Sequence, residues 1–143
     1  ELLGVKIGLL ICWDQWFPEA ARLTAMLGAD LLYFPTAIAW ESQEDTNVKE
    51  KELEAWKTVI RSHAICNGLY TFTVNRVGQQ GDFIFWGNSF ICAPDGEVLE
   101  QLDSQSGSLD FTESLDNEIH RNTWPFFRDR RIDLYGDLNK RWQ

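Results

Sequence analysis

The sequence lacks the residue patterns that build metal centres, disulfide frameworks and membrane-spanning helices. It has 2 histidines and 3 cysteines, with no Cys-x-x-Cys pair and no closely spaced histidines, so a tetrahedral metal site is not predicted. Three cysteines cannot all pair, and their apolar surroundings indicate reduced thiols in a cytoplasmic protein, with Cys66 and Cys92 in the core. No apolar run approaches the roughly 20 residues that cross a bilayer, so no membrane partner is expected.

Basic residues are also scarce. The chain has 13 lysines and arginines against 22 aspartates and glutamates, which gives a net charge of −9. Nucleic acids and anionic membranes bind proteins with a basic face, so neither is expected as a partner. A small cationic substrate is compatible with this charge. Hydrophobic residues make up 44% of the 143 residues, and the absence of repeats and linkers is typical of one domain with a sizeable core.

The hydrophobic pattern predicts an α/β fold. An apolar run over residues 5–11 favours a strand buried on both faces, and Pro18 suits the first position of a helix over 18–27. A second strand over 31–34 completes a right-handed βαβ unit. Further along, the pattern predicts a loop over 40–47, a helix over 50–67, a strand over 69–74, a loop over 75–86, a β-hairpin over 88–102, a short strand over 108–111 and a helix over 115–122.

Cys12 lies where the first predicted strand turns sharply into the helix that Pro18 begins. α/β proteins place reactive side chains at such turns, where amide hydrogens stabilise a thiolate and an oxyanion. The residues alone leave two interpretations open. Cys12 is either a nucleophile, with the Trp13 backbone amide as an oxyanion donor, or a buried structural thiol. A nucleophile needs a base, and His63 and His120 are the histidines available for a Cys–His pair.

The run from Ile11 to Arg22 resembles the nucleophile elbow of the nitrilase, or carbon–nitrogen hydrolase, superfamily. Within it, residues 12–19 (Cys-Trp-Asp-Gln-Trp-Phe-Pro-Glu) are similar to the branch that hydrolyses N-carbamoylputrescine. Four later segments agree with the resemblance: 33–38 (Tyr-Phe-Pro-Thr-Ala-Ile), 74–78 (Val-Asn-Arg-Val-Gly), 86–90 (Trp-Gly-Asn-Ser-Phe) and 126–131 (Phe-Phe-Arg-Asp-Arg-Arg). The similarity runs nearly end to end and matches the second half of a typical family member.

The resemblance implies that residues 1–143 form a single partial domain, the C-terminal half of a four-layer αββα sandwich. Family members use a glutamate as general base and a lysine beside the oxyanion, and both precede the cysteine. The residues of these types before Cys12 are Glu1 and Lys6, and neither lies in a matching motif. The N-terminal half with its catalytic glutamate and lysine is therefore expected to be absent, and the isolated chain is predicted to be inactive.

The resemblance also implies a reaction and a substrate. Cys12 would be the nucleophile of a thiol amidohydrolase that cleaves N-carbamoylputrescine to putrescine, carbon dioxide and ammonia. No cofactor or metal is implied. Neutral Gln15 and Trp16 stand where relatives that bind a carboxylate carry arginines. Glu41 is the candidate partner for the substrate ammonium, while Trp40 offers an apolar wall or cation–π face and Trp16 joins them at the substrate site. A solvated loop position and a buried packing role are the alternatives for Glu41 and Trp40.

Glu19 and Arg22, three residues apart on the first predicted helix, are expected to support the elbow rather than to act in catalysis. Because the family commonly assembles through its central sandwich, a homo-oligomer is expected. Two other functions stay open. One is another amidase of the superfamily, of the β-ureidopropionase or omega-amidase type, and the other is a catalytically incomplete fragment or assembly subunit.

Overall fold

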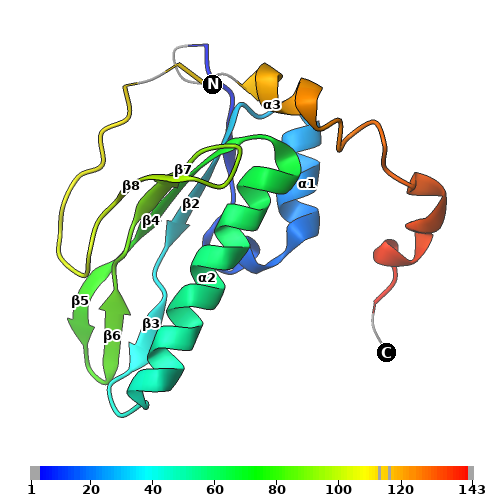
Figure 1. Cartoon of the computed structure of the whole chain (residues 1–143). Helices are drawn as coiled ribbons and strands as arrows, with labels where there is room; N and C mark the ends of the chain where they lie inside the picture. Colours follow the sequence, from blue (N-terminus) through cyan, green and yellow to red (C-terminus); the bar gives the residue numbers. More distant parts are fainter. Residues whose placement is uncertain (1–3, 113, 116, 142–143) are drawn as a thin grey trace.

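The computed structural model describes residues 4–112, 114–115 and 117–141. Within them, strands form a five-stranded sheet in the order β1-β2-β4-β7-β8 and a three-stranded sheet in the order β3-β6-β5 (Figure 1). The first sheet contains β1 (Ile7–Leu9), β2 (Leu31–Thr36), β4 (Tyr70–Asn75), β7 (Phe90–Cys92) and β8 (Val98–Gln101), and the second contains β3 (Ala39–Glu41), β5 (Val77–Gln80) and β6 (Phe83–Trp86). The helices are η1 (Cys12–Trp16), α1 (Pro18–Met26), α2 (Thr46–Asn67), α3 (Asn117–Thr123), η2 (Ile132–Leu134) and η3 (Gly136–Asn139), of which the η elements are 3₁₀ helices. The predicted α/β fold class is confirmed.

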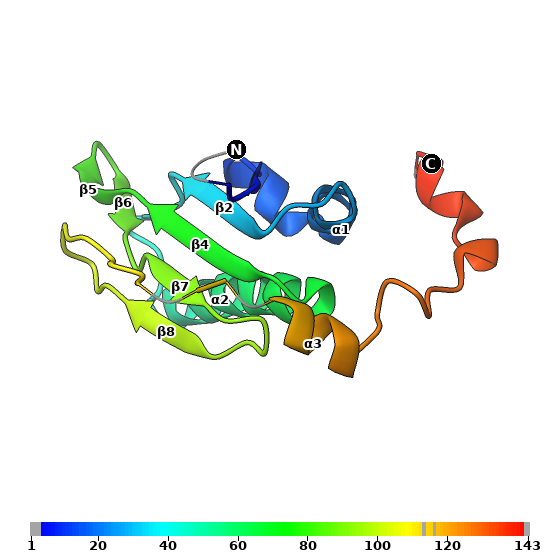
Figure 2. The same cartoon turned by 90° about the horizontal axis from the view of Figure 1, so that it is seen from above.

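The first three strands of the five-stranded sheet run parallel. β1 pairs with β2 and β2 with β4 in parallel register, whereas β7 and β8 extend the sheet in antiparallel register. Helix α1 connects β1 to β2, and α2 lies in the longer connection from β2 to β4 (Figure 2). The predicted βαβ opening and the hairpin of β7 and β8 are confirmed. The carboxyl ends of β1, β2 and β4 meet at one end of the sheet, which is where α/β proteins bind ligands.

The main core lies between this sheet and the helices α1 and α2. Phe34 of β2 and Phe90 of β7 are buried against Trp56 of α2, and the Phe90 and Trp56 ring centroids are 5.5 Å apart. Helix α1 approaches β1 so closely that a β-carbon at Gly8 would overlap Cγ2 of Thr24. This close approach fixes the position of α1 relative to β1, and therefore the geometry of the turn between them.

On the opposite face of the sheet, the segment after β8 covers part of β4. Phe111 lies against Tyr70 and Phe72, with ring centroids 5.3 and 5.4 Å apart. Residues 108–111 belong to no strand, so the predicted short strand is wrong. Phe111 loses water contact by lying on the sheet face, which does not require strand pairing.

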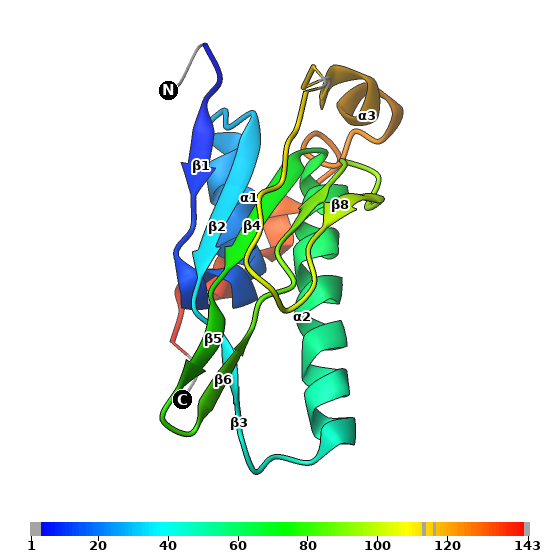
Figure 3. The ribbon, with the colours of Figure 1, turned by 90° about the vertical axis from the view of Figure 1, so that its left-hand side faces the viewer.

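The three-stranded sheet forms an arm that extends beyond the larger sheet, alongside the first half of α2 (Figure 3). β5 and β6 pair around Gly81, which adopts a φ of 58°, and Trp40 pairs with Ile84 across β3 and β6. The prediction of a loop over 75–86 is therefore wrong, as is the placement of Trp40 and Glu41 in a loop. Three of the four residues of β5 are exposed, so this strand has no hydrophobic alternation from which to predict it.

Strand β1 is less buried than its composition predicts. Ile7 and Leu9 are 41% and 56% exposed, whereas Gly8 between them is buried. Among the described residues β1 is an edge strand, and only the face toward α1 is packed. The prediction of a strand buried on both faces is wrong in this chain, because nothing in the described residues covers the second face of β1.

Helix α2 begins at Thr46, four residues before the predicted start. The Asp45 carboxylate accepts a hydrogen bond from the Asn47 amide at 2.9 Å, which caps the helix. The predicted end is confirmed, because Gly68 follows Asn67 with a left-handed φ of 57°. Cys66, expected in the core, lies on the exposed face of α2, so that prediction is wrong. No helix in the described residues is long and apolar enough to cross a membrane.

Candidate active site

Cys12 occupies a strained turn between β1 and α1. It is the first residue of η1, its φ is +49°, and its side chain is partly exposed. A residue with a β-carbon pays on the order of 1–3 kcal/mol to hold such a conformation, and strain of this kind clusters at functional sites. Of the two interpretations left open by the sequence, the partly exposed, strained thiol favours the nucleophile over a buried structural cysteine.

Local hydrogen bonds close the turn. The Ile11 amide donates to Oδ2 of Asp14 at 3.0 Å, and the Asp14 amide donates back to the Ile11 carbonyl at 3.1 Å. The Phe17 amide then donates to the Asp14 carbonyl at 3.1 Å. Pro18 follows as the first residue of α1, as predicted. The segment therefore turns sharply from strand to helix within six residues of Cys12.

Gln15 joins this turn to the core. Its side chain is 1% exposed, and Oε1 accepts a hydrogen bond from Nε1 of Trp56 at 2.6 Å. Oγ1 of Thr36 lies 3.3 Å from the same oxygen. Nε2 of His63 lies 2.7 Å from the Gln15 backbone carbonyl. This role of Gln15 was not predicted from the sequence, although a signal was present: a tryptophan on the apolar stripe of a helix needs an acceptor for its N–H.

His63 is hydrogen-bonded to the turn that contains Cys12 and not to the Cys12 thiol. Its ring stacks on Phe34 with centroids 5.9 Å apart, and Nε2 is bonded to the Gln15 carbonyl. No hydrogen bond joins His63 to Cys12 in the described structure. Burial lowers the pKa of His63, and the bond to the Gln15 carbonyl opposes that shift without cancelling it. Folding therefore favours the neutral form of the ring.

His120 lies at the other end of the sheet. Its helix, α3, is attached to the loop before β2, because Nδ2 of Asn117 donates to the Asp30 carbonyl at 2.7 Å and the Arg121 guanidinium donates to the Ala29 carbonyl at 3.3 Å. Cys12 follows the carboxyl end of β1. Since β1 and β2 are parallel, these positions lie at opposite ends of the strands, so neither histidine is placed to form a Cys–His pair.

The free energy of unfolding is expected to decrease as the pH falls below about 6.5, the ordinary pKa of histidine. Between that value and the lowered pKa of folded His63, the unfolded chain binds more protons than the folded one. The contribution of neutral His63 to the free energy of unfolding is therefore fully present above pH 6.5. It is lost as the pH falls from there through the pKa of folded His63, with a slope of at most about 1.4 kcal/mol per pH unit. Urea unfolding at several pH values measures this slope.

His63→Gln should flatten that pH dependence, while His120→Gln, the matched change on α3, should leave it in place. An unchanged slope in His63→Gln would contradict the assignment of this titration to His63.

The predicted substrate residues lie on two elements. Trp16 in η1 meets Trp13 with ring centroids 6.4 Å apart and packs against the core. Trp40 in β3 lies against Trp86 with ring centroids 4.8 Å apart and the ring planes tilted by 50°, and it is partly buried. Glu41 is exposed at the end of β3 and lines a hollow of about 570 Å³ in the arm, together with Asp82. Cys12 does not line that hollow, so the structure does not bring Glu41 and Cys12 into one cavity.

Glu19 and Arg22 do not form an ion pair in the described structure. The Arg22 guanidinium lies over the ring of Phe127, 4.9 Å from its centroid, and Arg121 lies over the same ring at 5.5 Å. Arg22 therefore connects α1 to the segment after α3. Glu19 is exposed, and the supporting role predicted for it remains a prediction.

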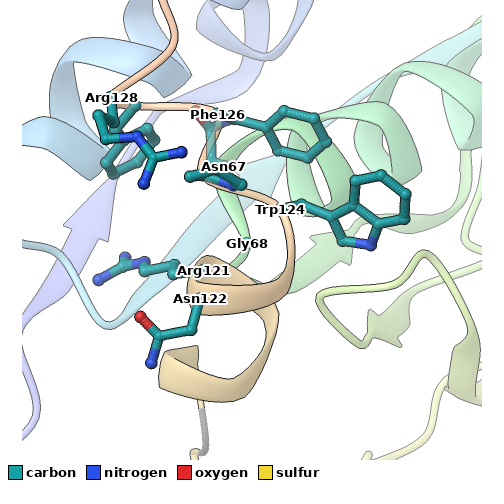
Figure 4. A pocket seen from close by; sticks show the side chains of 9 residues that line it. Asn67, Gly68, Arg121, Asn122, Trp124, Phe126 and Arg128 are labelled. Carbon is teal, nitrogen blue, oxygen red and sulfur yellow. The ribbon is translucent and has the colours of Figure 1, made fainter.

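A separate hollow of about 260 Å³ lies where the end of α2 meets α3 and the following segment (Figure 4). Trp124 and Phe126 stack there with centroids 6.2 Å apart, beside Asn67 and Arg121. Because Arg121 is bonded to the Ala29 carbonyl before β2, this hollow belongs to the end of the sheet away from Cys12. It is not part of the candidate active site.

The described residues include no group of three or more His, Cys, Asp or Glu side chains that could hold a metal ion. Cys12, Cys66 and Cys92 are all free thiols. The chemistry that the site offers is that of a cysteine at a strained turn, next to the first amides of a 3₁₀ helix.

An α/β sheet with a strained cysteine at the turn from a parallel strand into a helix is the arrangement typical of nucleophile-elbow hydrolases. The chain belongs to the carbon–nitrogen hydrolase family, because the model of that family matches residues 1–112. The family resemblance seen in the elbow and in the segments 33–38, 74–78 and 86–90 is thereby confirmed, whereas the segment 126–131 lies outside the matched residues.

Sequence and structure comparisons agree on the family. The chain is 39% identical to the N-carbamoylputrescine amidase of Arabidopsis thaliana over 144 aligned residues, covering 93% of this chain and 47% of the relative. It is similar to a carbon–nitrogen hydrolase structure from Helicobacter pylori G27, with a TM-score of 0.89 and 40% identity over 97% of this chain and 50% of that one. It also resembles a mutant amidase from Nesterenkonia sp. AN1 that shows the result of Michael addition of acrylamide at the active site cysteine, with a TM-score of 0.72 and 28% identity over 96% of this chain and 47% of that one. The chain spans about half the length of the curated relatives that it matches.

Proposed function

We propose that this chain carries the nucleophile of a thiol amidohydrolase that cleaves N-carbamoylputrescine. The observation that carries the proposal is the strained, partly exposed Cys12 at the strand-to-helix turn. The similarity to the Arabidopsis thaliana N-carbamoylputrescine amidase supports the choice of substrate.

In the proposed reaction the Cys12 thiolate attacks the ureido carbonyl carbon, and the Trp13 amide stabilises the resulting oxyanion. Trp13 suits this role because it lies in the first turn of η1, where amide hydrogens have no partner within the helix. The C–N bond to the terminal nitrogen then breaks. Ammonia leaves with the proton that the general base took from the thiol, and the carbamoyl carbon stays bonded to the Cys12 sulfur as a thioester. Water cleaves the thioester and regenerates the thiol, and the released carbamate gives putrescine and carbon dioxide.

We further propose that residues 1–143 are the C-terminal half of an αββα catalytic domain, with the general base and the oxyanion lysine outside these residues. Lys6 is the lysine that precedes Cys12, but the two lie six positions apart along nearly extended chain, or roughly 20 Å. The exposed apolar side chains of β1 and the half-length match to the relatives support the same proposal.

The substrate is proposed to be a small cationic carbamoylated amine, held by Glu41 with Trp40 and Trp16. β3 follows directly from the carboxyl end of β2, so Glu41 lies toward the same end of the sheet as Cys12. Another amidase of the family, of the β-ureidopropionase or omega-amidase type, is the second candidate, and a preference for a substrate carboxylate would identify it.

Self-association and a cytoplasmic location complete the proposal. Leu23 on α1, Leu27 directly after α1 and Leu138 in η3 are more than half exposed, and a partner subunit would cover such side chains. The three free thiols support the proposal of a reducing compartment. Sedimentation of the purified protein would show whether it forms oligomers.

Ammonia release from N-carbamoylputrescine tests the function. The chain is assayed alone and joined to the residues that carry the glutamate and lysine, here called the completed enzyme. We expect turnover by the completed enzyme only, and we expect the chain alone to aggregate or to bind a hydrophobic dye. Turnover by a soluble 143-residue monomer would overturn the need for a second half. If the completed enzyme releases no ammonia from ureido or amide substrates, the chain is not part of an active amidase, and the alternative function of a non-catalytic assembly subunit is favoured.

A further inference from the structure

The strained turn at Cys12 needs support from outside itself. The hydrogen bonds among Ile11, Asp14 and Phe17 are local, and they move with the segment that they close. A residue held at an unfavourable φ keeps that conformation only when the surrounding structure fixes it. The contacts from other elements to this turn are therefore the ones that hold the thiol in place.

Two of these contacts come from one face of α2 and end on Gln15. Nε1 of Trp56 lies 2.6 Å from Oε1 of Gln15, and Nε2 of His63 lies 2.7 Å from its backbone carbonyl oxygen. An indole N–H can only donate, so it fixes the orientation of the Gln15 amide, and the carbonyl can only accept, so Nε2 of His63 carries its hydrogen. Because Trp56 and His63 are seven residues apart, two turns of helix present them on the same side.

The same two side chains are anchored in the core. Trp56 is 0% exposed and its ring meets Trp86 and Phe90 with centroids 5.8 and 5.5 Å apart. His63 stacks on Phe34 of β2. The packing of α2 on the sheet therefore sets the position of Gln15, which lies three residues after Cys12.

We propose that Trp56 and His63 are positioning residues, which hold the Cys12 thiol in its reactive orientation by fixing Gln15. This proposal rests on the proposed role of Cys12 as nucleophile. Neither side chain is hydrogen-bonded to the thiol, so each acts through Gln15. Loss of either N–H lets the turn relax, which lowers the reactivity of the thiol while leaving the substrate residues Glu41 and Trp40 in place.

The chain offers a matched control for Trp56. Trp86 is 2% exposed, lies in the same core cluster, and its indole N–H has no hydrogen-bond partner in the described structure. Trp56→Phe and Trp86→Phe therefore both replace a buried indole with a smaller ring, but only Trp56→Phe removes a bond to Gln15.

The test is made on the completed enzyme, with iodoacetamide as the probe and residue-resolved mass spectrometry as the readout. Trp56→Phe should lower the rate of Cys12 alkylation and kcat by roughly ten- to a hundredfold, with KM changed by less than about threefold. Trp86→Phe should leave the alkylation rate within about twofold of the parent. His63→Gln, which keeps an N–H donor, should retain more alkylation rate than His63→Phe, which has none.

The thermal midpoint is measured for every variant. If Trp56→Phe and Trp86→Phe lower the midpoint and the alkylation rate equally, the bond to Gln15 is only structural and the inference is wrong. The inference is also wrong if Trp56→Phe leaves the alkylation rate unchanged. Alkylation needs no substrate, so it tests the inference separately from the function. If Trp56→Phe slows Cys12 alkylation but the parent enzyme does not hydrolyse N-carbamoylputrescine, the inference is supported and the proposed function is overturned.

Discussion

Replacing Cys12 by serine is expected to reduce kcat of the completed enzyme by a factor of about 10⁴ or more, with little change in stability. A serine hydroxyl is a weaker nucleophile at neutral pH, and a base that suits a thiol does not deprotonate it efficiently. The Cys12 side chain is partly exposed and its thiol makes no hydrogen bond to another described residue, so the free energy of unfolding should decrease little. Ammonia release and urea unfolding measure the two effects.

Cys66→Ser is the matched control. Cys66 is an exposed thiol on α2, with Oγ of Ser62 at 3.8 Å, and its replacement should leave kcat within about twofold. A Cys12→Ser enzyme that keeps more than a tenth of the parent kcat would show that Cys12 is not the nucleophile.

The three thiols should also differ in their reaction with iodoacetamide. Burial raises the pKa of Cys92 to about 11, so its thiolate is scarce and its access is blocked. Cys66 is exposed and serves as the reference for an ordinary accessible thiol. Cys12, next to the first amides of η1, should react faster than Cys66. Equal rates at Cys12 and Cys66 would argue against an activated nucleophile.

The parts of the fold that the sequence predicts are those in which one element carries its own signal. Pro18 marks the start of α1, Gly68 marks the end of α2, and the turn before Glu97 marks the hairpin of β7 and β8. In each case a local backbone requirement is met by a residue type suited to it. The position of Cys12 at the strand-to-helix turn follows from the same kind of signal.

The parts that the sequence did not predict depend on contacts between distant residues. Gln79 and Gln80 form a strand because β6 pairs beside them, although their own side chains are polar and exposed. Cys66 is exposed because the packed stripe of α2 runs through Trp56, Ile60 and Ala64 instead. The apolar composition of α2 alone could not distinguish its packed face from the exposed face that carries Cys66.

The same limit applies to the candidate site. The elbow motif identifies Cys12, but the support of the turn comes from residues 41 and 48 positions after Gln15 in the sequence. A buried tryptophan predicts that an acceptor exists without saying which one it is. The role of Gln15 becomes visible only once α2 is packed against η1.

Glu41→Gln should lower kcat/KM of the completed enzyme for N-carbamoylputrescine by roughly ten- to a thousandfold. The carboxylate is the proposed partner of the substrate ammonium, and the amide that replaces it is similar in shape but carries no charge. The same substitution should change kcat/KM for a neutral N-carbamoyl alkylamine of equal length by less than about threefold. Steady-state ammonia release with both substrates measures the difference.

Glu44→Gln is the matched control, because Glu44 lies three residues further along and its amide donates to the Glu41 carbonyl at 3.1 Å, a backbone bond that neither substitution removes. Its replacement should affect both substrates alike and weakly. If Glu41→Gln impairs the charged and neutral substrates equally, Glu41 acts in structure or catalysis and does not recognise the ammonium. If the unmodified enzyme prefers N-carbamoyl-β-alanine, the enzyme is of the β-ureidopropionase type. Glu41 would then not hold the substrate, because its carboxylate would repel the substrate carboxylate.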